Sequence, residues 1–310
     1  MSCNSTLVIL NKIISKISIL FIFFVISLDA SALKKDIKTV VITGGTYGIG
    51  KEVALIFSHA GWNVWVTTRS QKEAMSNESD ANIKVISLDL TNDNDVRLAI
   101  DKIYKDSSRI DVLVNNAGYG LLGAGESLTL DQIKDQFDVN LYGSIRMIQS
   151  VLPIMRKQCS GRIINVSSTS GIRAVPGLGA YAASKMALEG FSEALIAELN
   201  PWNIHVSLIQ PGTVKNDWVN NCVYGLNIVD DKYTTLSTTL KNTLVQRAKN
   251  GQEQVEVGKL VLEAATSENP HFRYQTSDQA VGIAKEIYVD PQGDLMKEKM
   301  TEFAKTLYKG

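Results

Sequence analysis

Tyr181 and Lys185 form a pair of side chains whose spacing could support proton transfer. Residues four apart lie on one face of a helix, so the phenol and the ammonium would be neighbours if this segment is helical. An isolated tyrosine titrates near about 10, which is too high for ready proton exchange at neutral pH. A nearby positive charge favours the phenolate and lowers that pKa. The pair therefore predicts a general acid, although a plain pair on a helix surface has the same spacing.

A second motif is the glycine-rich segment 43–50, which reads TGGTYGIG. It follows an apolar run typical of a strand and opens a helical pattern, where backbone N–H groups can approach a pyrophosphate. Residues 45–51 also fit the G-x-x-x-x-G-K pattern of nucleotide triphosphatases. That pattern continues with a serine or threonine that binds magnesium, and here Glu52 follows instead. The segment therefore predicts a nucleotide-binding loop that does not belong to a triphosphatase.

The end of the next strand candidate indicates which nicotinamide dinucleotide would bind. Folds specific for NAD carry an acidic residue there, about 20 residues on, which binds the ribose 2′-hydroxyl. In this chain the sequence is Thr67-Thr68-Arg69-Ser70, without an acid. The Arg69 guanidinium can pair with a 2′-phosphate, which favours NADP. The alternative is that Arg69 is a solvated surface residue.

The elements that would position these residues alternate from Lys38 onward between short apolar runs and helical patterns. That alternation indicates β-α-β units around a buried parallel sheet. It predicts a single α/β domain, a doubly wound (Rossmann-type) mostly parallel sheet with helices on both faces. The strand candidates are Thr39–Thr43, Asn63–Thr67, Lys84–Leu88, Val112–Asn115, Arg162–Val166 and His205–Ile209.

Three helices have clear sequence signals. Apolar residues at helical spacing precede Gly61, which predicts a first helix with a glycine after its end. A Thr129-x-x-Gln132 capping box predicts a long helix that runs through Asn140 towards Leu152. A third apolar stripe follows Tyr181.

Composition indicates an ordinary globular protein. Of its 310 residues 45% are hydrophobic, and 32 basic residues balance 32 acidic ones. A neutral chain has no field that attracts nucleic acid, so no nucleic-acid partner is expected. The cysteines and histidines show no metal-ligand spacing, so neither a metal site nor a disulfide framework is predicted.

The first 32 residues are expected to lie outside the domain, which would span residues 33–310. A largely apolar run, Ile17–Leu28, follows two lysines and precedes an A-x-A site at 30–32, as in a secretory signal peptide. Its twelve residues span about 18 Å as a helix, short of the bilayer core of about 30 Å. An uncleaved membrane anchor and a start codon placed too early are the alternatives. The protein would be exported or membrane-associated with a leader, and cytoplasmic without one.

Five motifs follow one another along the chain: the glycine loop at 43–50, NNAG at 115–118, Ser168, the Y-x-x-x-K pair from Tyr181 to Lys185, and Pro211-Gly212. In this order they make the sequence resemble the short-chain dehydrogenase/reductase family. The spacing of its glycines is similar to that of the compact branch, and unlike that of the extended branch with its epimerases and dehydratases. The resemblance implies hydride transfer between NADP(H) and an alcohol or carbonyl.

The resemblance also implies a catalytic tetrad of Asn140, Ser168, Tyr181 and Lys185. Ser168 would hydrogen-bond the substrate oxygen, and it is chosen over two nearby serines because its distance from Tyr181 matches the family. The Asn140 amide would turn towards a water that leads protons to Lys185, unless it is an ordinary polar residue of its helix.

For the cofactor, the resemblance implies a set of contacts along the carboxyl edge of the sheet. The family often has threonine near position 216 to bind the carboxamide, where this chain has Asn216, whose amide can also donate and accept. The cofactor contacts would be Gly44, Thr46, Tyr47, Gly48, Ile49, Gly50, Arg69, Asp89, Leu90, Asn116, Ala117, Gly118, Tyr181, Lys185, Pro211, Gly212 and Val214.

Apolar residues near these motifs favour an apolar substrate, such as a sterol, a retinoid or a long-chain carbonyl. The polar stretch 215–250 is interpreted as a mobile insertion whose apolar residues form a lid, or else merely bury the insertion. NPHFRY at 269–274 is similar to a segment of the steroid and retinol dehydrogenase subgroup. The lid residues would be Tyr119, Leu121, Leu122, Trp218, Val219, Val223, Tyr224, Leu226 and Ile228.

A non-catalytic NADP-binding sensor or scaffold is the alternative function, because a fold alone does not decide function. A sensor would be expected to lose Tyr181 or Lys185, and this chain keeps both. The resemblance further implies assembly through two long helices, around 131–152 and 181–199, into a homodimer or homotetramer. The leader at residues 1–32 could add membrane association.

Overall fold

The structure is a computed structural model that describes residues 37–70, 82–225, 227, 230–288, 292, 294, 297–298 and 301. The compact unit that starts at Thr39 holds all the helices and strands named below. The predicted leader at residues 1–32 lies outside the described residues, as do Leu226 and Ile228 of the predicted lid.

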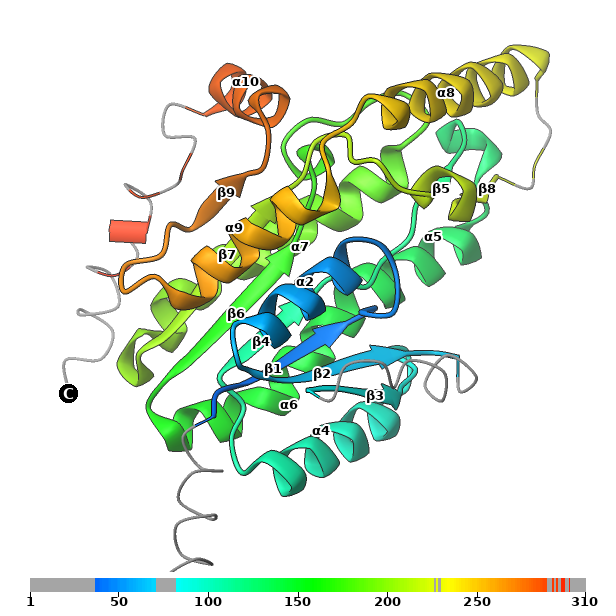
Figure 1. Cartoon of the computed structure of the whole chain (residues 1–310). Helices are drawn as coiled ribbons and strands as arrows, with labels where there is room; N and C mark the ends of the chain where they lie inside the picture. Colours follow the sequence, from blue (N-terminus) through cyan, green and yellow to red (C-terminus); the bar gives the residue numbers. More distant parts are fainter. Residues whose placement is uncertain are drawn as a thin grey trace, which may run out of the picture. The chain divides into compact units, whose positions relative to one another are not determined.

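A parallel sheet forms the centre of this unit. In the described residues its seven strands follow the order β3-β2-β1-β4-β6-β7-β9, and each neighbouring pair is parallel (Figure 1). The chain winds outwards from β1 on one side and from β4 on the other, which is the predicted doubly wound arrangement. The strands are β1 (Thr39–Thr43), β2 (Asn63–Thr68), β3 (Ile83–Ser87), β4 (Val112–Asn115), β6 (Gly161–Val166), β7 (Ile204–Gln210) and β9 (Arg273–Gln275).

The six predicted strands are confirmed, with ends that differ by at most one residue. Both β1 and β4 are buried along their whole length, as expected for strands covered on both faces. The edge strand β9 was not predicted as a strand, because its three residues are too few to show a period. Its first two residues, Arg273 and Tyr274, belong to the 269–274 segment that the sequence singled out for another reason.

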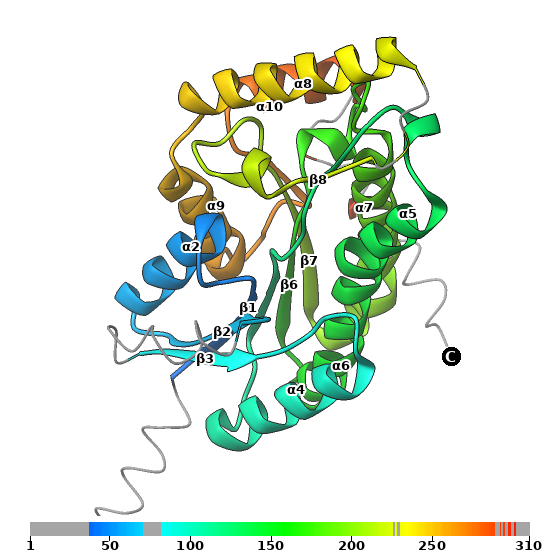
Figure 2. The ribbon, with the colours of Figure 1, turned by 90° about the vertical axis from the view of Figure 1, so that its right-hand side faces the viewer.

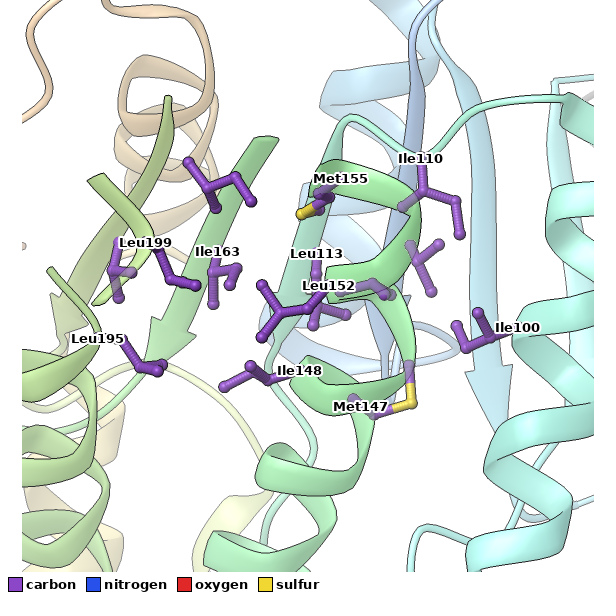
Figure 3. Packing of buried hydrophobic residues seen from close by; sticks show 14 of the residues in the cluster. Ile100, Ile110, Leu113, Met147, Ile148, Leu152, Met155, Ile163, Leu195 and Leu199 are labelled. Carbon is purple, nitrogen blue, oxygen red and sulfur yellow. The ribbon is translucent and has the colours of Figure 1, made fainter. Parts of the chain in front are cut away.

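Helices cover both faces of the sheet. One face carries α2 (Gly48–His59) and α9 (Gln254–Thr266), and the other carries α4 (Asp93–Ser107), α6 (Gly143–Gln158) and α7 (Gly179–Leu199), as Figure 2 shows. A buried apolar cluster fills each side. Figure 3 shows the cluster on the face that carries α4, α6 and α7, which includes Ile100, Leu113, Met147, Ile148, Ile163 and Leu195.

The long helix predicted from Thr129 is interrupted. Its capping box is present, because Thr129 Oγ1 accepts from the Gln132 N–H and Gln132 Oε1 accepts from the Thr129 N–H. After α5 (Leu130–Phe137) the chain forms a π-helical turn, η2 (Asp138–Tyr142), before α6 begins. A π turn adds a residue to one helical turn, so the two flanking helices differ in phase, and such turns are often found at functional sites. Asn140 lies in this turn.

The stretch 215–250 contains regular structure that its weak periodicity did not indicate. Helix α8 (Asp231–Lys249) lies across the carboxyl end of the sheet, and none of its residues is fully buried (Figure 2). Two short strands, β5 (Leu121–Leu122) and β8 (Val223–Tyr224), join this stretch to the segment after β4. The remaining described helices are η1 (Gly125–Ser127), η3 (Thr169–Gly171), η4 (Asn200–Trp202), η5 (Trp218–Asn221) and α10 (Asp278–Ile287).

Across the described part of the chain, the helices fall short of the length and apolar character that a membrane span requires.

Two residues of α4 allow a matched test of the core. Ile100 is 2% exposed and Leu98 is 51% exposed. We expect Ile100→Ala to lower the free energy of unfolding by about 2–5 kcal/mol, because it leaves a cavity between the helix and the sheet. Leu98→Ala should change it by no more than about 0.5 kcal/mol. Urea titration followed by circular dichroism measures both, and equal losses would contradict the assignment of this face to the core.

Candidate active site

The glycine-rich loop joins β1 to α2. Gly44 and Gly48 have φ angles of +64° and +62°, a region in which other residues are strained. Helix α2 begins at Gly48 without a side-chain cap from Tyr47, which leaves first-turn N–H groups as donors for an anion. A Cβ on Gly48 would meet no atom within 4 Å, so there is open space beside these donors. The loop thus fits the pyrophosphate of a dinucleotide.

Asn116 holds this loop in place. Its Nδ2 donates to the carbonyl oxygens of Thr43 at 3.0 Å and Gly44 at 3.1 Å. Thr43 Oγ1 accepts from the backbone N–H groups of Asn116 and Ala117, both at 3.0 Å. A Cβ on Gly50 would lie 2.3 Å from the Gly44 carbonyl oxygen and 2.6 Å from Asn116 Nδ2. The glycine and NNAG motifs are therefore one structural unit.

Arg69 and Asp89 lie on neighbouring segments, directly after β2 and shortly after β3. The Asp89 carboxylate accepts from the Thr91 N–H at 2.9 Å and from its hydroxyl at 2.8 Å. These hydrogen bonds hold the pKa of Asp89 below its usual value against a small effect of burial, and the charge of Arg69 lowers it further. The structure thus brings the two residues predicted for the adenosine end of the cofactor together.

Arg146 of α6 connects this region to the π turn. Its guanidinium donates to the Leu90 carbonyl oxygen at 3.1 Å and to the Asp138 carboxylate at 2.6 Å. It also donates to the Asp93 carboxylate at the start of α4. The segment that carries Leu90 is therefore tied to the π turn that carries Asn140.

Tyr181 and Lys185 lie in the first turns of α7 and are 7% and 4% exposed. Lys185 Nζ is 5.9 Å from the centre of the Tyr181 ring and donates to the Val166 carbonyl oxygen at 2.8 Å. Ser168 follows shortly after β6, and its Oγ accepts from the Ser170 N–H at 3.0 Å. The three residues predicted to react together thus meet at the carboxyl end of β6.

Burial dominates the ionisation of this pair. It raises the pKa of Tyr181 to about 12, although a hydrogen bond with Ser168 acts in the opposite direction. It also lowers the pKa of Lys185 to about 8, while the charge of Glu189 raises it. Lys185 is therefore mostly charged at neutral pH. The expected lowering of the Tyr181 pKa does not arise from the protein groups alone, because burial outweighs the hydrogen bond with Ser168.

Asn140 is fully buried, and its side chain contacts the segment after the NNAG motif. Its Oδ1 accepts from the Tyr119 N–H at 3.1 Å, and its Nδ2 donates to the Tyr119 carbonyl oxygen at 3.0 Å and to Ser184 Oγ at 3.2 Å. A Cβ on Gly118 would lie 3.0 Å from Asn140 Oδ1 and 3.6 Å from Lys185 Nζ. Asn140 and Lys185 thus flank the same glycine, and the Asn140 amide binds the backbone of Tyr119. The proton relay through a water stays a prediction.

Pro211 and Gly212 follow β7, at the same carboxyl edge of the sheet as the glycine loop after β1. Val214, 7% exposed, pairs with Gln252 in an isolated bridge. Asn216 Oδ1 accepts from the Trp218 N–H at 3.0 Å, so this amide oxygen forms a hydrogen bond within its own loop.

An apolar wall surrounds the Tyr181 ring. The Trp218 ring lies 5.0 Å from it, centre to centre, at an angle of 58°. A Cβ on Gly120 would lie 2.6 Å from both Cys222 Sγ and the Trp218 ring, so the glycine lets these side chains approach. The wall consists of Leu122, Leu178 and Cys222, with Val175, Trp218, Tyr224, Leu240 and Leu244 packed against them.

Several residues of this wall were not identified from the sequence. Leu240 and Leu244 have the i, i+4 spacing of a helix face, but the polar residues around them hid that signal. Cys222 was interpreted only as a packing or surface residue. Of the predicted lid, Leu122, Trp218 and Tyr224 are members of the wall.

Comparison with known proteins agrees with this geometry. Residues 38–224 match the short chain dehydrogenase family. The 3-ketodihydrosphingosine reductase of Bacteroides thetaiotaomicron is 32% identical over 270 residues, which are 87% of this chain and 97% of that protein. Retinol dehydrogenase 8 of Bos taurus is 31% identical over 280 residues, 83% of this chain and 87% of that protein.

Solved structures share the fold. A short-chain dehydrogenase from Streptomyces avermitilis superposes with a TM-score of 0.74 at 26% identity, over 88% of this chain and 98% of that one. ElxO with NADP bound superposes with a TM-score of 0.65 at 25% identity, over 79% of this chain and 99% of that one.

The glycine loop yields a direct test. Gly50→Ala should weaken the binding of NADPH by at least about tenfold, because the added methyl group overlaps the Gly44 carbonyl oxygen and displaces the loop. Gly282→Ala is the matched control, since a Cβ there meets nothing within 4 Å. Quenching of protein fluorescence by NADPH measures both affinities. A Gly50→Ala protein that binds NADPH as tightly as the parent would contradict the assigned site.

Proposed function

This chain belongs to the short-chain dehydrogenase family, and from that premise we propose that it interconverts an alcohol and a carbonyl with NADP(H) as cofactor. The observation that carries the proposal is the meeting of Tyr181, Lys185 and Ser168 at the sheet edge that also carries the glycine loop. Delivery of a proton and a hydride to one carbon–oxygen bond requires an acid and a dinucleotide site side by side.

In the reductive direction, the dinucleotide held at the glycine loop would supply the hydride for the carbonyl carbon. Tyr181 gives its phenolic proton to the oxygen, and Ser168 Oγ donates a hydrogen bond to the same oxygen as negative charge builds there. The charged Lys185, 5.9 Å from the Tyr181 ring, stabilises the phenolate that remains. Asn140 holds the backbone of Tyr119 and so shapes the segment beside Lys185.

We assign the preference for NADP to Arg69. Arg69 lies directly after β2, where folds specific for NAD carry an acidic residue, and this segment contains no acid. The solved structure of ElxO contains NADP. A guanidinium binds a phosphate through charge-assisted hydrogen bonds that a ribose hydroxyl cannot match.

For the substrate, we propose an apolar carbonyl or alcohol of the sterol, retinoid or long-chain type. The support is the apolar wall over Tyr181, from Leu122 to Leu244, which offers mainly hydrocarbon contacts. The names of the two relatives refer to 3-ketodihydrosphingosine and to retinol, compounds with long or bulky hydrocarbon parts.

Two further expectations are kept as proposals. We propose that residues 33–310 form the catalytic domain and that residues 1–32 are a signal peptide or membrane anchor. We also propose assembly through α5, α6 and α7. Leu130 of α5, Tyr142 of the π turn η2 and Met186 of α7 expose 73%, 50% and 39% of their surface, which gives a second copy apolar area to cover.

Removal of the Tyr181 hydroxyl group tests the proposed proton donor. Tyr181→Phe should lower turnover of an apolar ketone by at least about a hundredfold, since it removes the only proton that the proposal assigns to the oxygen. Affinity for NADPH should stay within about threefold, because the phenyl ring keeps its packing against Trp218. Oxidation of NADPH followed by absorbance measures turnover. Full activity without the hydroxyl would show that another group supplies the proton.

Cofactor choice depends on Arg69 in this proposal. Arg69→Gln should weaken the binding of NADPH by about tenfold or more, because one charge-assisted contact to the 2′-phosphate is lost. Binding of NADH, which has no such phosphate, should hardly change. Parallel titrations with the two dinucleotides separate these effects. An equal loss for both would mean that Arg69 acts on the shape of the site and not on the phosphate.

A further inference from the structure

Glu189 is a carboxylate in the interior, 4% exposed, one helical turn after Lys185 on α7. A buried charge is unfavourable unless hydrogen bonds and opposite charges compensate it. Burial raises the pKa of Glu189, and hydrogen bonds from Ser167 and Gln210 together with the charge of Arg273 lower it. The fold therefore retains this carboxylate at a cost, beside the residues of the candidate active site.

The partners of Glu189 come from three different strands. Ser167 Oγ, directly after β6, donates to Oε1 at 2.6 Å. Gln210 Nε2, at the end of β7, donates to Oε1 at 2.9 Å and to Oε2 at 3.0 Å. Arg273 of β9 is 7% exposed, and its Nε lies 3.7 Å from Oε2. One carboxylate thus connects α7 to β6, β7 and β9.

Two of these partners precede the residues that the proposed reaction uses. Ser167 is followed by Ser168, and Gln210 is followed by Pro211 at the nicotinamide end of the cofactor site. The two segments are also joined to each other, because the Ser167 N–H donates to the Ile209 carbonyl oxygen at 2.7 Å and the Thr169 N–H to that of Pro211 at 2.9 Å. Movement of the carboxylate would displace both segments.

The side chains of Glu189 and Ser167 are closely packed against Gly171. A Cβ on Gly171 would lie 2.5 Å from Glu189 Oε1 and 2.5 Å from Ser167 Oγ. Gln275 Nε2 donates to Gln210 Oε1 at 2.6 Å, which orients the Gln210 amide with its donors towards Glu189. The hydrogen-bond pattern therefore matches a carboxylate, which accepts at both oxygens, better than an amide.

We propose that Glu189 is a positioning residue for the reductase reaction, whose carboxylate holds the Ser168 and Pro211 segments against the helix turn that carries Lys185. The inference rests on the proposed function, because it assigns Glu189 a role in that same site. It adds a residue that does not touch the substrate and acts through its neighbours.

The charge of Glu189 also acts on Lys185. The titratable and charged groups that face the pair are Tyr181 and Glu193 of α7, Arg273 of β9, and Tyr288 after α10, whose pKa burial and Glu189 raise. Burial lowers the pKa of Lys185, and the charge of Glu189 raises it. Lys185 therefore stays protonated up to a pH of about 8, and loss of the carboxylate should lower that limit.

The test compares Glu189→Gln with Glu193→Gln in the full chain. Both residues lie on α7 and contact Arg273, but Glu193 is two turns beyond Lys185 and 3.3 Å from the Arg273 guanidinium. For reduction of an apolar ketone, we expect Glu189→Gln to lower kcat by at least about tenfold, with KM within about threefold. The alkaline limb of the kcat profile should shift down by about one pH unit. Glu193→Gln should keep the parent profile, and a parent-like profile for Glu189→Gln would overturn the proposal.

A second readout does not need turnover. In protein labelled with ¹³C at lysine Cε, the Lys185 signal, identified by its loss in Lys185→Arg, reports protonation of Nζ. Its midpoint should fall in Glu189→Gln and stay unchanged in Glu193→Gln, and an unchanged midpoint in both would overturn the inference. If the parent reduces no carbonyl, or does so without Tyr181, the proposed function fails while this titration still tests Glu189.

Ser167→Ala covers the case in which Glu189→Gln does not fold. It removes one hydrogen bond to the carboxylate and leaves all charges in place. We expect a loss of about tenfold in kcat with an unchanged alkaline limb, because the Ser168 segment loses its anchor while Lys185 keeps its neighbour. A kcat within about twofold of the parent would overturn the positioning role.

Discussion

Parallel pairing of the strands is the constraint on which the rest of this structure depends. A parallel sheet places the carboxyl ends of all its strands at one edge, so the segments that follow them meet whatever their distance in sequence. Here the glycine loop follows β1, the NNAG motif begins in β4, Ser168 follows β6, and Pro211 follows β7. The cost is that each strand must be covered on both faces, which explains the apolar clusters on either side of the sheet. The site polar groups are thus held by an interior with little freedom to rearrange.

Much of this arrangement could be predicted from local patterns, because the signals are local. Buried parallel strands appear as short apolar runs, and the capping box at Thr129 marks a helix start by two residues alone. The pair of Tyr181 and Lys185 needed only a helix for its geometry. The fold was therefore predictable from the sequence, as was the proximity of Tyr181 and Lys185 on α7.

What escaped prediction depends on contacts between distant residues. The π turn at Asn140 has no sequence signature, since its extra residue is accommodated by Arg146 and by the backbone of Tyr119. Strand β9 exists because it pairs with β7. Helix α8 presents Leu240 and Leu244 to a wall whose other residues come from three segments, around 122, 175–181 and 218–224. The high pKa of Tyr181 likewise reflects burial by that wall, which the spacing of the tyrosine and lysine does not show.

The small β5–β8 ladder determines where this fold can vary. Val223 donates to the Gly120 carbonyl oxygen at 2.8 Å and Gly225 to that of Leu122 at 2.8 Å, while Gln132 Nε2 binds the Tyr224 carbonyl oxygen at 2.8 Å. The stretch between β7 and α9 is thus held at β8, nearer to its β7 end. The part before β8 has a set register, so an insertion or deletion there would shift Trp218 relative to Tyr181. The part after β8 carries α8, whose Leu240 and Leu244 pack in the wall, so a change there alters the wall and leaves the β5–β8 pairing in place. Relatives of this scaffold can therefore remodel the outer side of the wall while the candidate residues on α7 keep their positions.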